Sequence, residues 1–313
     1  MRILLAGASG AIGQTLIPHL LRDQHEVFGL FRNPAHADRV KSLGATPVVA
    51  DALDGDAVHK VVAEIKPQAV LHQLTAIPAH IDLRHIDRDF ETTNRLRTEG
   101  TRNLATAAVK AGVEKFIAQS FAGWPYAPKG IRLKTEEDAL DSSPAPKLKA
   151  MLDAIDTLEH TVLREQGFTG IVLRYGPLYG PLSSIARDGA TVQEIRAHKV
   201  PIVGQGTGVW SFVHLEDAAT ATVAALNRGQ RGIYNIVDDD PAPVADWLPY
   251  LAECVGAKPP GHVPNFTAKL LLGEHVVELM NDIRGVSNEK ARRDLGWTPK
   301  WSSWRQGFRE ALG

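Results

Sequence analysis

The sequence contains a single cysteine, Cys254, among its 313 residues. One thiol can form neither an internal disulfide nor a metal site built from several cysteines. Long apolar runs are missing too, because no uninterrupted hydrophobic stretch reaches the roughly 18 residues of a membrane-spanning helix. The formal net charge is -1, so no basic excess points to nucleic acid and no charged block points to a membrane surface. We expect neither nucleic acid nor membrane as a partner.

Signals for several other chemistries are scarce. No Gly-x-Ser-x-Gly motif marks an esterase nucleophile. The densest histidine group, His80 and His85 among aspartates, has a five-residue spacing that puts the two rings on different faces of a helix and lacks a third ligand, so we predict no metal site. The run at residues 238–240 is three aspartates before a proline, which we interpret as capping the following turn.

The composition is that of an ordinary globular protein. Hydrophobic residues make up 44% and charged residues 23% of the chain, which suffices for a sizeable core. The apolar run near the N-terminus superficially resembles a signal peptide, but it is better interpreted as a first strand that the fold requires. We therefore expect a cytoplasmic protein.

The most informative stretch is the glycine-rich run at residues 7–13. Residues 2–6 form a short apolar segment typical of a buried strand, and residues 15–21 carry apolar side chains at helical spacing. Between them, Gly7 permits a tight turn, Gly10 lets the backbone approach a pyrophosphate, and Gly13 lets helix and strand pack closely. Ser9, Ala11 and Ile12 complete the loop. This pattern predicts a dinucleotide-binding site.

The next strand, at residues 27–31, indicates which dinucleotide binds. Such strands normally end in an acidic residue that bonds the adenosine ribose of NAD. Here Phe31 holds that place and Arg32 follows. Because a guanidinium can bind a ribose 2′-phosphate through two donors, we predict NADP, with NAD as the alternative cofactor. The competing interpretation is that Arg32 is a solvated loop cation beside Arg39 and Lys41.

Strand and helix patterns then alternate along the chain. Strands are predicted at 47–50, 69–72, 115–119 and 170–174, and helices at 57–65, 101–111 and 147–164. This alternation predicts an α/β protein with a Rossmann-type doubly wound parallel sheet. After residue 181 the pattern becomes irregular, with a short strand predicted at 210–213. We predict a dinucleotide-binding domain at 1–181 and, at 182–313, a smaller substrate-binding lid that interleaves with it.

Several motifs together resemble the extended short-chain dehydrogenase/reductase family, the group of nucleotide-sugar epimerases and dehydratases. The resemblance covers nearly the whole chain, including the runs at 173–181, 213–219 and 295–297. It implies further cofactor contacts. Asp51 and Ala52 match the pair that holds adenine, Leu74 and Thr75 lie in the segment beside the cofactor, Asn94 resembles an asparagine that steadies the central helix, and Tyr175 and Pro177 lie in the strand and loop that pass the nicotinamide.

The chain departs from this family at its proton donor. Family enzymes carry a tyrosine and, four residues later, a lysine that lowers the tyrosine's pKa. The tyrosines here are Tyr126, Tyr175, Tyr179, Tyr234 and Tyr250, and the residues four positions later are Gly130, Tyr179, Ser183, Asp238 and Cys254. Counting from Glu159 and Arg174 puts Met151 and Ile155 where the pair should stand. We therefore expect an atypical active site.

Two other residues are candidates for catalysis. Family enzymes place two small hydroxyl residues at the end of the fifth strand, and here Ser120 is followed by Phe121. Ser120 either touches the substrate or only bonds backbone at the strand end. Tyr126 lies just beyond that strand and either supplies a phenol to the site or only packs.

The leading hypothesis is an NADP-dependent oxidoreductase that acts on a carbonyl or alcohol of a small or medium-sized metabolite. One alternative is a nucleotide-sugar epimerase or dehydratase-like enzyme. Another is a sensor or scaffold protein that binds NADP without catalysis. The sequence specifies neither the substrate nor an oligomeric state.

Overall fold

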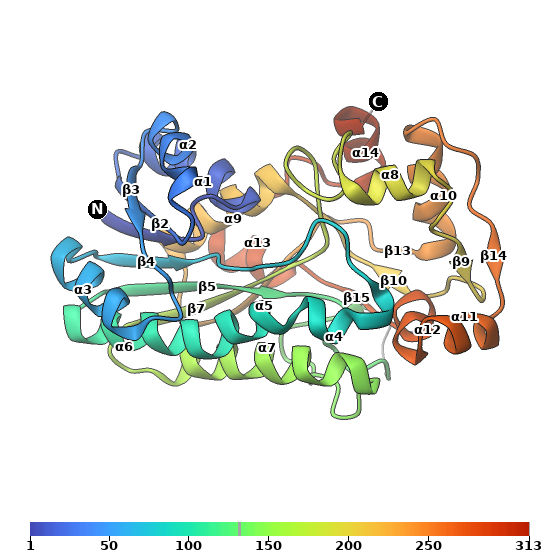
Figure 1. Cartoon of the computed structure of the whole chain (residues 1–313), viewed down its shortest axis with the longest axis horizontal. Helices are drawn as coiled ribbons and strands as arrows, with labels where there is room; N and C mark the ends of the chain where they lie inside the picture. Colours follow the sequence, from blue (N-terminus) through green and yellow to red (C-terminus); the bar gives the residue numbers. More distant parts are fainter. Residues whose placement is uncertain (131–132, 313) are drawn as a thin grey trace.

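The computed structural model describes residues 1–130 and 133–312. At its centre is a seven-stranded sheet in the order β12-β7-β5-β4-β1-β2-β3, and every neighbouring pair runs parallel (Figure 1). The strands are β1 (Arg2–Ala6), β2 (Glu26–Phe31), β3 (Thr46–Val49), β4 (Ala69–His72), β5 (Lys115–Phe121), β7 (Thr169–Tyr175) and β12 (Gly232–Ile236). The predicted doubly wound α/β fold is confirmed.

Helices cover both faces of this sheet (Figure 1). Ile3 and Leu5 of β1 belong to one apolar core with α1 (Ala11–Arg22), α2 (Ala37–Ser42), α9 (Leu215–Arg228) and α13 (Glu289–Leu295). Leu4 and Ala6 belong to a second core with α3 (Gly55–Ile65), α6 (Thr101–Ala111) and α7 (Pro146–Arg164). Successive β1 side chains point to opposite faces, so the strand is apolar throughout because both faces are buried.

The sheet reverses its strand order at β1. This strand pairs with β2 on one side and with β4 on the other. In doubly wound sheets, ligands bind outside the carboxyl ends of the strands at such a switch point. The turn after Ala6 and the segment after His72 flank this point, so the fold puts the glycine-rich run where a ligand is expected.

The chain beyond residue 181 contributes to two parts of the molecule. α9 and β12 return to the main sheet, whereas α8 (Ala190–Arg196), α10 (Val244–Cys254) and α14 (Trp304–Leu312) surround a third core that contains Phe212 and Trp247. This arrangement places later segments in both parts, and the boundary at residue 181 stays a prediction.

Short elements connect these parts. They are η1 (Pro34–His36), η2 (Leu83–His85), α4 (Ile86–Asp89), α5 (Glu91–Arg95), the π-helix η3 (Leu96–Gly100), β6 (Leu133–Lys134), β8 (Leu178–Tyr179), β9 (Ile202–Val203), β10 (Val209–Trp210), β11 (Val213–His214), β13 (Ala242–Pro243), β14 (His262–Val263), α11 (Asn265–Leu271), α12 (Glu274–Asn281) and β15 (Gly285–Val286). The prediction of a single strand at 210–213 was wrong. The chain changes partner there, because Trp210 pairs with β13 and Val213 pairs with β8.

Candidate functional site

The glycine-rich turn joins β1 to α1, and its three glycines have different structural roles. Gly7 has φ +96°, and a Cβ there would lie 2.6 Å from the Gln73 carbonyl oxygen. A Cβ on Gly13 would lie 2.3 Å from the Gly7 oxygen. These two glycines are therefore required by packing. Gly10 is exposed, and a Cβ there would meet only the Gly7 oxygen, at 3.4 Å.

The first turn of α1 is open to an anion. Gly10 is its N-cap, no side chain caps the helix, and its first turn holds no acidic residue. The N–H groups of Ala11, Ile12 and Gly13 have no carbonyl partner within the helix, and they add to the positive end of the helix dipole. Phosphate groups bind at such helix ends. The open place at Gly10 and the uncapped helix fit the pyrophosphate of a dinucleotide.

Two guanidinium groups follow β2, whose Leu30 carbonyl accepts a hydrogen bond from the Gly7 N–H of this turn at 2.9 Å. Arg32 is exposed directly after the buried Phe31 and donates no hydrogen bond within the described part of the chain. Arg39 Nε donates to Gln14 Oε1 at 2.9 Å, and Gln14 Nε2 donates to the Ser9 carbonyl at 2.7 Å. The Arg39 side chain is thereby held against the start of α1.

The pair after β3 shapes a small turn. Asp51 accepts a hydrogen bond from the Leu53 N–H at 3.0 Å, and the Ala52 carbonyl accepts one from Asn103 Nδ2 at 2.9 Å. Ala52 is buried and Asp51 is half-buried. The backbone here is fixed by its own contacts, and the Asp51 carboxylate remains partly accessible.

The end of β4 contacts α6, and the segment after it, which contains Leu74 and Thr75, contacts α5. His72 Nε2 lies 2.9 Å from Thr101 Oγ1, and the Ala76 N–H donates to Thr93 Oγ1 at 3.0 Å. Burial lowers the pKa of His72 to about 4, so this ring is neutral at physiological pH.

Buried polar atoms without partners gather around this segment. Gln73 Oε1, Asn94 Oδ1 and Arg97 Nη1 are all buried and make no hydrogen bond within the described residues. Buried polar groups are normally paired. Donors and acceptors left open beside the switch point are consistent with a polar ligand that satisfies them.

Tyr175 and Pro177 border the same region from β7. The Tyr175 hydroxyl lies 2.7 Å from Thr222 Oγ1 and accepts a hydrogen bond from Gln73 Nε2 at 3.4 Å. Burial raises the pKa of Tyr175 to about 12. The Pro177 carbonyl accepts from the Val213 N–H at 3.1 Å. Tyr175 therefore uses its hydroxyl to fix the strand end.

Ser120 and Tyr126, the two predicted catalytic residues, lie in one buried network. Ser120 Oγ donates to Glu159 Oε1 at 2.6 Å. The Glu159 carboxylate also accepts from Arg174, through Nε at 2.8 Å and Nη2 at 2.5 Å. Arg174 Nη1 donates to the Tyr126 hydroxyl at 2.7 Å, which donates to Asn235 Oδ1 at 2.8 Å.

Each hydroxyl in this network is engaged and covered. Ser120 and Tyr126 are each 1% exposed. Burial raises the pKa of Tyr126 to about 12, against the opposing effect of Arg174. A phenol that holds its proton this firmly is a weak general acid. The catalytic role of the two residues stays a prediction, and in this geometry neither hydroxyl is free for a substrate.

The places counted for the family's tyrosine and lysine, Met151 and Ile155, lie two turns and one turn before Glu159 on α7. Met151 is 4% exposed and Ile155 is fully buried. Met151 packs in an apolar cluster with Leu148 and Phe90, which Trp124 also contacts. An apolar surface therefore stands where an activated phenol is expected.

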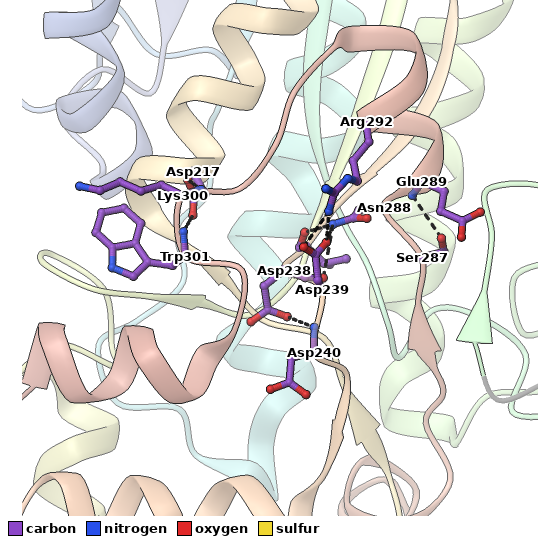
Figure 2. A network of polar contacts seen from close by, with 11 residues as sticks. Asp217, Asp238, Asp239, Asp240, Ser287, Asn288, Glu289, Arg292, Lys300 and Trp301 are labelled. Carbon is purple, nitrogen blue, oxygen red and sulfur yellow. Dashed lines mark hydrogen bonds and ion pairs between the residues drawn. The ribbon is translucent and has the colours of Figure 1, made fainter.

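Aspartates form a separate polar network just beyond the carboxyl end of β12 (Figure 2). Asp238 Oδ1 accepts from the Asp240 N–H at 3.2 Å, as expected for a capped turn. Asp239 accepts from Arg292 at 2.6 and 2.7 Å, and Asp217 accepts from the Lys300 and Trp301 N–H groups. These carboxylates fasten the C-terminal segment. Among the described residues, no group of three or more His, Cys, Asp or Glu side chains is arranged to hold a metal.

Sequence reasoning missed Arg97 and the interior role of Glu159 and Arg174. Arg97 is 4% exposed and lies four residues from both Thr93 and Thr101, so the three share one helix face. That spacing was a usable signal. The sequence shows Glu159 and Arg174 only as two separate charged residues within apolar segments, and it does not show that they form a pair.

Together, the fold and the uncapped glycine-rich turn define a Rossmann-type dinucleotide-binding protein. A family model described as the NAD dependent epimerase/dehydratase family matches residues 3–237, and the chain belongs to this family. This membership supports NAD binding and an NAD(P)-dependent oxidoreductase or epimerase class.

Named relatives support the same assignment. The chain is 41% identical over 309 residues to a Streptomyces protein named 3-diazoavenalumate denitrifying reductase, with 98% of this chain and 99% of the relative covered. It is 27% identical to a UDP-glucose 4-epimerase from Mycolicibacterium smegmatis, with 96% and 94% covered. These relatives are enzymes, so the family is one of NAD(P)-dependent reductases, epimerases and dehydratases.

Solved structures share the fold. A UDP-glucose 4-epimerase from Thermotoga maritima, crystallised with UDP-glucose, superposes with a TM-score of 0.79 at 23% identity and covers 100% of this chain and 97% of its own. A dTDP-glucose 4,6-dehydratase from Streptomyces venezuelae with NAD bound gives a TM-score of 0.78 at 20% identity, with 100% and 96% covered. No helix within residues 1–130 and 133–312 is long and apolar enough to cross a membrane.

Proposed function

We propose that this protein is an NADPH-dependent reductase whose substrate accepts hydride without needing a proton from the enzyme. The observation that carries the proposal is the contrast between two parts of the site. The dinucleotide cradle is complete, with an open Gly10 and an uncapped α1. Beside it, Met151 and Ile155 are apolar and buried, and Tyr126 is locked in the interior.

The chemistry of the acceptor explains how both features can coexist. When hydride adds to a carbonyl carbon, the oxygen gains negative charge and needs an acid. When hydride replaces the nitrogen of a diazonium group, a C–H bond forms, the C–N bond breaks, and its electron pair leaves on dinitrogen. The net change, R–N₂⁺ + H⁻ → R–H + N₂, takes up no proton.

The relative that is 41% identical supports this class of substrate. Its name describes a reductase that removes nitrogen from a diazo compound, and the identity extends over nearly all of both chains. We therefore assign a diazo compound, reacting in its diazonium form, as the substrate class. The carbonyl substrate predicted from the sequence is the competing assignment.

Different residues would contact different parts of the cofactor. The first turn of α1 would hold the pyrophosphate, and Asp51 with Ala52 would border the adenine. Arg32 and the nearby Arg39 would bind a ribose 2′-phosphate, which favours NADP over NAD. Leu74, Thr75 and Pro177 would border the nicotinamide, which supplies the hydride.

The decisive experiment compares acceptors. Purified protein with NADPH is given 4-carboxybenzenediazonium, a generic ketone or aldehyde, or UDP-glucose, and both NADPH oxidation and product are followed. A reaction without protein and one with Gly10→Val measure the uncatalysed background. We expect nitrogen release with the diazonium salt and slow turnover of the carbonyls.

Other outcomes point elsewhere. Faster reduction of carbonyls than of the diazonium salt overturns the proposed substrate class, and epimerisation of UDP-glucose supports the sugar-nucleotide alternative. NADPH binding without consumption in any mixture supports the sensor alternative.

A further inference from the structure

A buried cation lies beneath the segment that borders the nicotinamide half of the site. Arg97 is 4% exposed, and none of its guanidinium nitrogens donates a hydrogen bond within the described residues. Nη1 is fully covered and has no partner. Leaving a buried charged donor unpaired is costly, so this arrangement requires an explanation.

Neighbouring contacts fix the position of Arg97. Thr93, one turn before it, accepts from the Ala76 N–H, and Thr101, one turn after it, contacts His72. Because side chains four residues apart lie on the same face of a helix, Arg97 lies beneath the residues between His72 and Ala76. Those residues are Gln73, Leu74 and Thr75, and the last two are proposed to border the nicotinamide.

Arg97 also faces α7. The π-helix that carries Arg97 packs against α7. The negative charge of Glu159 on α7 favours the charged form of Arg97 and so raises its pKa. Ile155 lies one turn before Glu159 on the same side of α7, nearer the carboxyl ends of the strands. Arg97, from the neighbouring π-helix, therefore provides a positive charge on the side of α7 where α7 itself provides only the aliphatic Ile155.

Glu159 does not satisfy this cation. Its carboxylate oxygens are engaged by Ser120 and by two nitrogens of Arg174, with no hydrogen bond to Arg97. Burial lowers the pKa of Arg97 to about 10, with Glu159 opposing the change. The group is still charged near neutral pH.

We propose that Arg97 supplies the positive charge of the nicotinamide subsite, in place of a lysine at position 155. Its free nitrogens donate to an acceptor oxygen of the nicotinamide nucleoside, either a ribose hydroxyl or the carboxamide oxygen. This inference rests on the proposed cofactor, and it assigns to this chain a cofactor contact that comes from the π-helix.

The test separates the two halves of the cofactor. Dissociation constants are measured by calorimetry for NADPH and for adenosine 2′,5′-bisphosphate, which lacks the nicotinamide nucleoside. In Arg97→Met we expect NADPH to bind ~10-fold more weakly, as for the loss of one charge-assisted hydrogen bond, with the bisphosphate unchanged. Arg102→Met, which removes an exposed cation from the next turn, should leave both constants unchanged.

A second variant tests whether the two positions are equivalent. Arg97→Met combined with Ile155→Lys keeps one buried cation in the region, so it should fold and recover most of the NADPH affinity. Equal weakening of both ligands, no weakening of either, or a folded double variant without recovery overturns the role of Arg97. A native protein that binds the bisphosphate but not NADPH overturns this inference and the proposed function together.

Discussion

The Asp238 carboxyl group is buried and only half satisfied. It is 2% exposed, its Oδ2 has no hydrogen-bond partner within the described residues, and the nearby Tyr179 hydroxyl is also unpaired. Burial raises the pKa of Asp238 well above its ordinary value. An ionised carboxylate in this position opposes folding.

The sign of the resulting pH dependence follows from linkage. Because the folded pKa of Asp238 exceeds the unfolded value of about 3.9, this group lowers the free energy of unfolding as pH rises from that value to the folded pKa. We predict that Asp238→Asn stabilises the protein by about 1–3 kcal/mol at pH 8, with a smaller gain near pH 5. Thermal and urea unfolding at the two pH values measure it.

A matched control lies next to it in the same network (Figure 2). Asp239 is paired with Arg292 and Asn288, so Asp239→Asn should destabilise the protein, by less than about 1 kcal/mol because the pair is partly exposed. A loss of stability in Asp238→Asn at pH 8 would show that this carboxylate has a partner in solution.

At Arg32, the prediction concerns cofactor choice. A charge-assisted bidentate contact with a phosphate contributes roughly 1.5 to 3 kcal/mol, so Arg32→Ala should weaken NADPH binding about tenfold to a hundredfold and leave NADH nearly unchanged. Fluorescence titration with both cofactors measures the difference, with Lys41→Ala as a control for charge alone. Equal losses for both cofactors would contradict the NADP assignment.

At the scale of elements, the junction of β1 and α1 separates a binding glycine from a packing glycine. Gly10→Val should abolish dinucleotide binding and keep the far-ultraviolet circular dichroism spectrum, because its Cβ would meet only the Gly7 oxygen, at an ordinary contact distance of 3.4 Å. Gly13→Val should instead destabilise the fold, because its Cβ would lie 2.3 Å from the Gly7 oxygen. Cofactor binding that survives in Gly10→Val removes the basis of the functional assignment.

Short sequence patterns predict those helices and strands that depend mainly on residues close together in the sequence. β1, α1 and β4 were predicted within a residue or a few, since apolar runs and helical spacing reflect burial on the sheet. The strand at 210–213 was mispredicted because pairing with β13 and β8 depends on segments far away in the sequence.

The candidate site was predictable to a different degree in its two halves. The glycine-rich run predicts the turn between β1 and α1, because such a turn is formed by residues that are adjacent in the sequence. The network of Ser120, Glu159 and Arg174 joins three elements, and no spacing in the sequence reveals that these side chains meet. Arg97 went unnoticed for a different reason. Its spacing from Thr93 and Thr101 was visible in the sequence, but its significance depends on the lack of a hydrogen-bond partner for Nη1 within the described residues.

At the scale of the whole molecule, the central feature is the combination of the proposed dinucleotide site at the start of α1 with an apolar surface on α7 at Met151 and Ile155. If Arg97 provides the cation, the component missing for carbonyl reduction is a single phenol. We predict that Met151→Tyr raises kcat/KM for a generic ketone at least ~10-fold, toward the roughly 10² to 10⁴ typical of general acid catalysis. Reduction of the diazonium salt should change by no more than about threefold, because that reaction takes up no proton.

The matched control for this change is Met151→Phe, which adds the same ring to the apolar cluster without the hydroxyl. The phenol accounts for the gain only if Met151→Phe fails to reproduce it and if the gain falls as pH rises through the pKa of the new tyrosine. Tyr126→Phe should leave both activities near the native level, because that hydroxyl is engaged by Arg174 and Asn235. Abolished turnover in Tyr126→Phe with an intact fold would place the proton donor in the interior network and restore the catalytic role predicted for Tyr126 from the sequence.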